Sequence, residues 1–172
     1  MKDARLLTLT GPGGIGKTRF ALELAHRLGG DFPDGARFIS LAGLDAPERV
    51  GPELEPMLGL EALVVIDNFE QLLDAAGELN PLLSSGTKVI VTSRAPLRIA
   101  AEHELALGPL AAEPAAALFE RRARAVDPRL ELEPGDEQRI AEICARLDGL
   151  PLAIELAAAR IKVLSPAENL DR

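Results

Sequence analysis

A glycine-rich segment of eight residues, Gly11–Thr18, constrains the fold of this chain more than any other feature. It has the order Gly-Pro-Gly-Gly-Ile-Gly-Lys-Thr, follows an apolar run at 6–10, and opens an amphipathic run at 19–28. A strand, a glycine loop and a helix in this order are the setting of a P-loop, in which backbone N–H groups and the helix N-terminus surround phosphate oxygens. An ordinary glycine turn with a solvated Lys17 is the alternative, but all four fixed positions of the P-loop pattern are matched. The segment therefore predicts a nucleoside-phosphate site.

The P-loop pattern assigns chemical roles within this segment. We expect the Lys17 ammonium to reach the β- and γ-phosphates and the Thr18 hydroxyl to ligate Mg²⁺. The predicted nucleotide-binding set is Gly11, Pro12, Gly13, Gly14, Ile15, Gly16, Lys17, Thr18 and Arg19.

Composition argues against several other classes of protein. The chain has 172 residues and a formal net charge of −8, whereas binding to a nucleic-acid backbone needs clustered Lys and Arg. The basic cluster at 121–124 falls in a helical pattern and is interpreted as a solvated helix face. The apolar run near the N-terminus is too short for a signal peptide, and the single cysteine suits a reducing compartment. We expect a cytoplasmic segment that binds neither nucleic acid nor membrane.

Strand and helix patterns alternate through the first part of the chain. The expected strands cover residues 6–10, 36–41, 62–67, 87–92 and, more weakly, 104–107. A short helix is expected around 52–58 and a longer one from Glu70 to Leu83, although Gly77 and Pro81 weaken the second. This alternation predicts an α/β P-loop fold with a mostly parallel five-stranded sheet flanked by helices, and a site at the carboxyl ends of the strands.

The pattern becomes entirely helical near Pro109, and a small all-helical lobe is predicted after the sheet. Its expected helices cover residues 113–126, 136–147 and 151–164. We therefore divide the chain into a nucleotide-binding domain, 1–110, and a helical lobe, 111–172. Cys144 lies on the apolar face of the middle helix and is interpreted as a core thiol. The segment Ser165–Glu168 matches a capping box that announces a further helix, so we expect the parent protein to be longer.

Two further segments carry candidate catalytic groups. Asp67 ends a buried strand, where a carboxylate holds Mg²⁺ opposite Thr18; a helix cap or turn is the alternative. Its neighbour Asn68 cannot act as a general base. Glu70 is the nearest carboxylate that could polarise an attacking water; the alternative is that it is an ordinary residue in the first turn of the following helix. Arg94 follows another strand and either senses the γ-phosphate or pairs with a surface acid. Slow hydrolysis is the expected consequence.

Four segments in order resemble a known family. They are 10–18, 63–70, 91–94 and 147–153, the last with the order Leu-Asp-Gly-Leu-Pro-Leu-Ala. The chain resembles the NB-ARC class of signal-transduction ATPases with numerous domains (STAND), and within it the ATPase module of bacterial transcriptional regulators of the AfsR and LuxR types. The resemblance covers nearly the whole chain.

The resemblance implies a switch operated by ATP or ADP with Mg²⁺. In such modules ADP holds the closed form, exchange for ATP permits opening and self-association, and the proline of the last segment, here Pro151, approaches the nucleotide. The implied partners are an adenine nucleotide and other domains of a longer parent chain. Two other functions stay open from the residues alone: a catalytic P-loop enzyme, such as a small-molecule kinase or a fast ATPase, and an interaction module with a vestigial P-loop.

Overall fold

The computed structural model describes residues 4–161 and shows two compact units. Among the described residues, the first contains 4–13 and 17–107, and the second contains 108–161 together with Gly14–Gly16 of the glycine loop.

The first unit is built on a five-stranded sheet with the order β2-β3-β4-β1-β5. Every neighbouring pair of strands is parallel, which confirms the predicted α/β class. The strands are β1 (Leu6–Thr10), β2 (Ala36–Ser40), β3 (Leu63–Asp67), β4 (Lys88–Thr92) and β5 (Glu102–Ala106). Because all strands run the same way, the segments that follow β1, β3 and β4 meet at one edge of the sheet.

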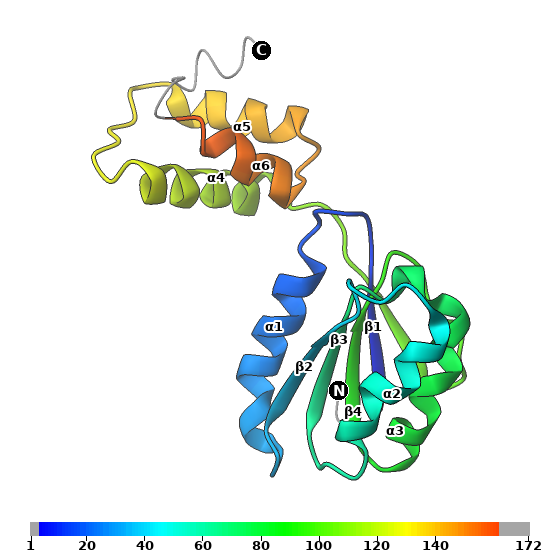
Figure 1. The fold of residues 1–172 in the computed structure, drawn as a ribbon. Coiled ribbons are helices and arrows are strands. Elements are labelled where there is room, and N and C mark those ends of the chain that lie inside the picture. The colour runs from blue at the N-terminus through cyan, green and yellow to red at the C-terminus, as the bar shows by residue number, and fades with distance from the viewer. Residues whose placement is uncertain (1–3, 162–172) are drawn as a thin grey trace. The chain divides into compact units, whose positions relative to one another are not determined.

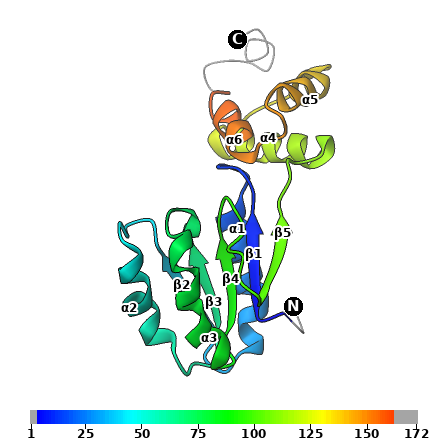
Figure 2. The same ribbon diagram turned by 90° about the vertical axis from the view of Figure 1, so that its right-hand side faces the viewer.

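Helices cover both faces of this sheet (Figures 1 and 2). One face packs against α1 (Lys17–Leu28), whose small residues Ala21 and Ala25 are buried against it. The other face packs against the short helices α2 (Val50–Leu54) and α3 (Asn80–Ser84). The central strand β3 is buried at all five positions, as its uninterrupted apolar run predicts for a strand covered on both faces.

The long helix predicted from Glu70 to Leu83 is wrong. The chain instead forms a 3₁₀ helix at Phe69–Gln71, a second at Leu73–Leu79, and only then α3. Leu72 separates the first two with φ −126° and ψ 30°, outside the helical region. Pro81 lacks a backbone N–H and Gly77 weakens helices, so 3₁₀ pieces replace one continuous α-helix. Further 3₁₀ helices occur at Gly29–Asp31, Pro47–Arg49 and Glu55–Met57.

The second unit contains α4 (Ala112–Val126), α5 (Asp136–Arg146) and α6 (Pro151–Ala158) around its own apolar core. Cys144 is only 2% exposed within that core, which confirms the core thiol, and burial raises the pKa of this thiol. Helix α6 ends at Ala158, earlier than predicted, because tight i→i+3 hydrogen bonds follow at Arg160 and Ile161. The predicted capping box at Ser165–Glu168 lies outside the described residues.

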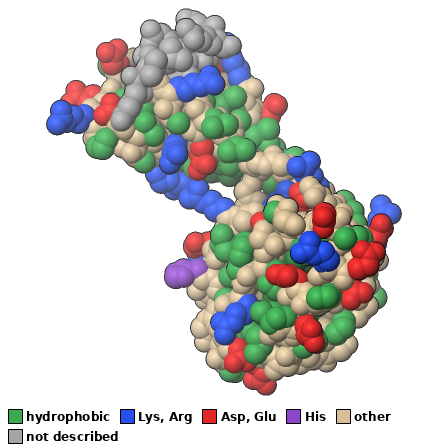
Figure 3. Space-filling view, viewed as in Figure 1, with side chains coloured by type: hydrophobic (Ala, Val, Ile, Leu, Met, Phe, Trp, Pro, Cys, Tyr) green, Lys and Arg blue, Asp and Glu red, His purple; other side chains and the backbone are tan. Residues whose placement is uncertain are grey.

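Charged side chains of both signs are interspersed on the face of the molecule seen in Figure 3. Within residues 4–161, every helix is too short or too polar to cross a bilayer.

Candidate functional site

The glycine loop joins β1 to α1 in the order that a P-loop requires. Gly14 has φ 76° and Gly16 has φ 95°, conformations that side-chain-bearing residues rarely adopt. The first turn of α1 begins at Lys17, so the unpaired N–H groups of a helix N-terminus lie directly after the loop. The local sequence therefore produces a glycine loop with positive φ angles that leads directly into a helix N-terminus.

Lys17 is folded against the loop that precedes it. Its Nζ donates hydrogen bonds to the carbonyl oxygens of Gly11 at 2.8 Å and Pro12 at 3.0 Å, and the residue is only 9% exposed. Burial lowers the pKa of Lys17 below 10.5, with a further lowering from Arg94 and opposing contributions from Glu70 and Asp67. The ammonium thus lies in a largely desolvated position at the loop, and its hydrogen bonds to the described residues are to backbone carbonyls.

Thr18 and Asp67 meet although 49 residues separate them in the chain. The Thr18 hydroxyl donates to Asp67 Oδ1 at 2.7 Å, because α1 starts beside the carboxyl end of β3. Asp67 Oδ1 also accepts a hydrogen bond of 2.6 Å from the hydroxyl of Thr92, the last residue of β4. The Asp67 side chain forms no ion pair with any cation of the described residues. A buried carboxylate oxygen beside a hydroxyl, without a protein cation, is a donor set suited to Mg²⁺.

Glu70 and Arg94 form an ion pair at the same edge of the sheet. Arg94 Nε lies 3.2 Å from Glu70 Oε1, and the other carboxylate oxygen, Oε2, is buried without a hydrogen-bond partner in the described structure. The Glu70 side chain is 18% exposed and that of Arg94 is 68% exposed. An added Cβ at Gly13 would lie 3.8 Å from Arg94 Nη2, so the guanidinium borders the glycine loop. The structure thus shows the pairing of Arg94 with an acid, and sensing of the γ-phosphate stays a prediction.

The remaining predicted residues are placed as follows. Ile15 is 5% exposed, whereas Arg19 is exposed on the first turn of α1. Pro151 begins α6 in the helical unit, after an elbow in which Gly149 has φ 65°. A Cβ at Gly149 would collide with the carbonyl oxygen of Leu110, which explains the glycine of the Gly-Leu-Pro-Leu-Ala segment by packing within that unit.

The sequence interpretation gave no role to Thr92, although it singled out the segment 92–94. It also missed the backbone of Asn68, which has φ 64° and ψ 49°, the left-handed region that non-glycine residues seldom adopt. The sequence feature that could have pointed to Thr92 is its position as a threonine at the end of a buried strand next to the P-loop strand.

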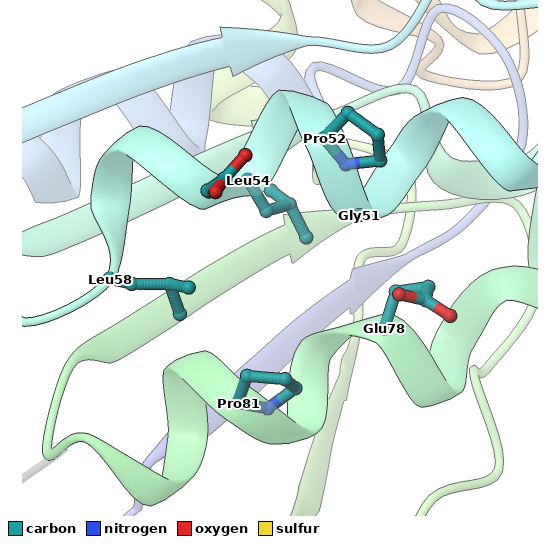
Figure 4. A pocket seen from close by; sticks show the side chains of 7 residues that line it. Gly51, Pro52, Leu54, Leu58, Glu78 and Pro81 are labelled. Atoms are coloured by element: carbon teal, nitrogen blue, oxygen red, sulfur yellow. The ribbon is translucent and has the colours of Figure 1, made fainter.

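A cavity of about 390 Å³ lies elsewhere in the sheet unit, between the α2 and α3 segments (Figure 4). It is lined by Gly51, Pro52, Leu54, Glu55, Leu58, Glu78 and Pro81, none of which is a predicted site residue. Among the described residues, no cluster of three or more His, Cys, Asp or Glu side chains could hold a metal ion. Any metal at the predicted site would therefore need ligands from outside the protein, such as phosphates and water.

Comparison with known proteins supports the predicted resemblance. No protein-family model matches the sequence. The chain is 31% identical over 179 residues to the regulatory protein AfsR of Streptomyces coelicolor, a match that covers 89% of this chain and 18% of AfsR. It is also 34% identical over 190 residues to a proposed HTH-type transcriptional regulator of Mycobacterium tuberculosis, with 97% of this chain and 21% of that protein covered. The chain is related to AfsR-type regulators.

An uncharacterized protein of Mycobacterium tuberculosis is 36% identical over 193 residues, covering 99% of this chain. This AfsR-related chain spans about half the length of that relative, 49%, and less of the other two. Among solved structures, a STAND protein with a tetratricopeptide repeat sensor from Pyrococcus horikoshii superposes with a TM-score of 0.55 at 20% identity, covering 89% of this chain and 27% of that one. The chain therefore has the fold of a STAND ATPase module.

Proposed function

We propose that this chain is the nucleotide-binding module of a larger regulatory protein and that it binds ATP or ADP with Mg²⁺ at the glycine loop. The observation that carries the proposal is the convergence of Thr18 and Asp67, at 2.7 Å, beside a buried Lys17. A vestigial loop has no requirement for a desolvated ammonium and a buried carboxylate at the same edge, since each costs folding free energy unless a ligand makes use of it.

Each group has a definite role in this proposal. Backbone N–H groups of the loop and the Lys17 ammonium bind the phosphates, while the Thr18 hydroxyl and the Asp67 carboxylate hold Mg²⁺, directly or through water. The bound ion supplies positive charge that offsets the charge of the phosphates. The residues fit the ion because Asp67 is 7% exposed and, among the described residues, its carboxylate accepts hydrogen bonds from two hydroxyls and forms no ion pair.

Hydrolysis is proposed to be slow. Glu70 is the carboxylate placed to polarise a water, and Arg94 is placed to stabilise the γ-phosphate. The 3.2 Å pair between them engages one oxygen of the carboxylate and the Nε of Arg94. Both groups must leave this pair before they can act, so the free module is held in a weakly catalytic arrangement.

The larger protein is proposed to be a cytoplasmic transcriptional regulator in which this module acts as a switch. The similarity to AfsR and to a proposed HTH-type transcriptional regulator supports a regulatory parent, and the fold of a STAND protein supports a nucleotide switch. In this proposal ADP favours a closed form, ATP permits opening and self-association, and Pro151 contacts the nucleotide from the helical unit.

Calorimetric titration with Mg-ADP and Mg-ATP tests the proposal. We expect micromolar or tighter binding by the wild-type chain, loss of that binding in Lys17→Ala, and stronger binding of ADP than of ATP. Lys88→Ala is the matched control, because Lys88 begins β4 at the opposite edge of the sheet. A folded wild-type sample that binds neither nucleotide would overturn the proposal, and turnover of many ATP molecules per second would replace it with a catalytic enzyme.

A further inference from the structure

Thr92 connects the two strand ends that carry the candidate metal ligand and the candidate phosphate sensor. It is the last residue of β4, it is 1% exposed, and its hydroxyl makes two hydrogen bonds. Thr92 Oγ1 donates to Asp67 Oδ1 at 2.6 Å and accepts from the backbone N–H of Asn68 at 3.1 Å. Both bonds reach the carboxyl end of the neighbouring strand β3.

The bond to Asn68 restrains an unusual backbone conformation. Asn68 has φ 64°, in the left-handed region, which asparagine adopts more readily than other residues with a side chain, and the hydrogen bond of its N–H helps to hold that conformation. The N–H of Asn68 belongs to the peptide that follows Asp67, and its hydrogen bond to Thr92 fixes the direction in which the chain leaves β3. This restraint fixes the backbone position from which the Asp67 side chain extends.

The bond to Asp67 restrains the carboxylate itself. Thr18 and Thr92 both donate to Oδ1, whereas Oδ2 accepts no hydrogen bond from the described residues. The carboxylate is therefore held by one oxygen, and the rotation that would exchange the two oxygens breaks both bonds. Mg²⁺ demands nearly ideal octahedral geometry, so the orientation of its carboxylate ligand, direct or through water, affects its affinity strongly.

We propose that Thr92 is a positioning residue that orients Asp67 for the Mg²⁺ of the bound nucleotide. This inference rests on the proposed function and assigns a new residue to that site. Thr92 acts through Asp67 and does not itself contact the ion or the phosphates. Its removal lowers the gain in nucleotide affinity that Mg²⁺ provides, by about tenfold, and leaves the Mg²⁺-independent contacts of the glycine loop in place.

Thr87 provides a matched control at the other end of the same strand. It directly precedes β4, it is fully buried, and its hydroxyl also makes two interactions. Thr87 Oγ1 donates to the carbonyl oxygen of Leu60 at 2.9 Å and lies 3.0 Å from Ser85 Oγ. Thr87→Val and Thr92→Val therefore remove comparable buried hydrogen bonds, but only Thr92→Val touches the candidate site.

The experiment measures the dissociation constant of ADP by calorimetry with Mg²⁺ and with EDTA, for the wild-type chain, Thr92→Val, Thr92→Ser and Thr87→Val. Far-UV circular dichroism melts without ligand report folding stability for each variant. We expect the ratio of the two constants to fall about tenfold in Thr92→Val, to recover in Thr92→Ser, and to stay at the wild-type value in Thr87→Val. Thr92→Cys, a weaker donor of similar size, replaces Thr92→Val if the valine variant fails to fold, and a reduced ratio is expected there too.

The outcomes separate this inference from the proposed function. A wild-type ratio in Thr92→Val, or an equal loss in Thr87→Val, overturns the role of Thr92 while nucleotide binding stands. A wild-type chain that binds ADP equally with and without Mg²⁺ overturns both the metal role of Asp67 and this inference. A wild-type chain that binds no nucleotide overturns the proposed function and, with it, the role of Thr92.

Discussion

Each unit of the molecule buries an aspartate, and the two carboxylates have different partners. Asp136 of the helical unit is 5% exposed and Asp67 of the sheet unit is 7% exposed. The Asp136 carboxylate accepts 2.9 Å hydrogen bonds from Arg139 Nη1 and from the backbone N–H of Glu133. Among the described residues, the Asp67 carboxylate accepts hydrogen bonds only from the hydroxyls of Thr18 and Thr92.

The difference shows how a structural carboxylate is told apart from a site. Asp136 pairs with the guanidinium of Arg139 and accepts a hydrogen bond from the backbone N–H of Glu133, just before α5. Its negative charge is therefore balanced within the fold. Asp67 forms no ion pair with the described residues, although the Lys17 ammonium interacts with it electrostatically, and a buried charge without a contacting counter-charge is unfavourable. That unfavourable state is understandable where a cation is bound during function.

The largest expected effect is on ADP binding, which we expect to depend on Asp67 and not on Asp136. Asp67→Asn is expected to lower the Mg²⁺-dependent gain in ADP affinity by at least about tenfold, because a neutral amide is a poor ligand for Mg²⁺. Folding stability should stay level or rise, since the amide oxygen still accepts the two hydroxyls. Titration with Mg²⁺ and with EDTA measures the effect, and Asp136→Asn serves as the control. An equal loss in both variants would contradict the comparison.

The next largest effect is on the free energy of unfolding, which we expect to depend on Asp136. Asp136→Ala should lower the free energy of unfolding by about 2 kcal/mol, because the N–H of Glu133 and the guanidinium of Arg139 lose their partner. Urea unfolding followed by far-UV circular dichroism checks this, since the chain has no Trp or Tyr to serve as a fluorescent probe. A variant as stable as the wild type would show that Asp136 is not the structural member of the pair.

A smaller effect tests whether a missing partner alone marks a site. Thr8 is fully buried in β1, and its hydroxyl has no hydrogen-bond partner in the described structure. Thr8→Val should raise the free energy of unfolding by about 1 kcal/mol and leave ADP binding unchanged, because the hydroxyl is uncharged and lies within the apolar sheet. Thermal melts and ADP titrations of the variant measure both quantities, and weakened ADP binding would extend the site into the strand.

The smallest effect concerns protons. Burial holds the pKa of Lys17 below 10.5 in the free protein, and nearby phosphates would favour the charged ammonium and raise that pKa. Between the two values the complex holds a proton that the free protein has lost, so ADP binding takes up protons and its affinity falls as pH rises through this window. Calorimetry in two buffers of different ionisation enthalpy measures the uptake.

Lys17→Arg provides the control for this proton linkage, because a guanidinium stays protonated throughout the window. Proton uptake that persists in Lys17→Arg would assign the linkage to another group.

The local patterns of the sequence were sufficient to predict the glycine loop, its lysine and the parallel sheet. Glycines at positive φ, the helix start at Lys17 and the uninterrupted apolar run of β3 each depend on residues close together in the chain. The helix predicted from Glu70 failed because Pro81 and Gly77 lowered the helical preference, and packing of the short pieces against the sheet then decided the conformation.

By itself, the sequence determined which residues stand at the ends of the strands, because a strand end is a local property. Only the tertiary structure decided which of these residues meet. The contacts of Asp67 with Thr92 and of Glu70 with Arg94 join residues 25 and 24 positions apart. They exist because β3 and β4 are neighbours in the order β2-β3-β4-β1-β5. Strand order depends on how the whole chain packs, which no short segment encodes, and that packing gave Asp67 its two hydroxyl partners. The arginine partner of Asp136, by contrast, lies three residues further along the same helix and is a local feature of the sequence.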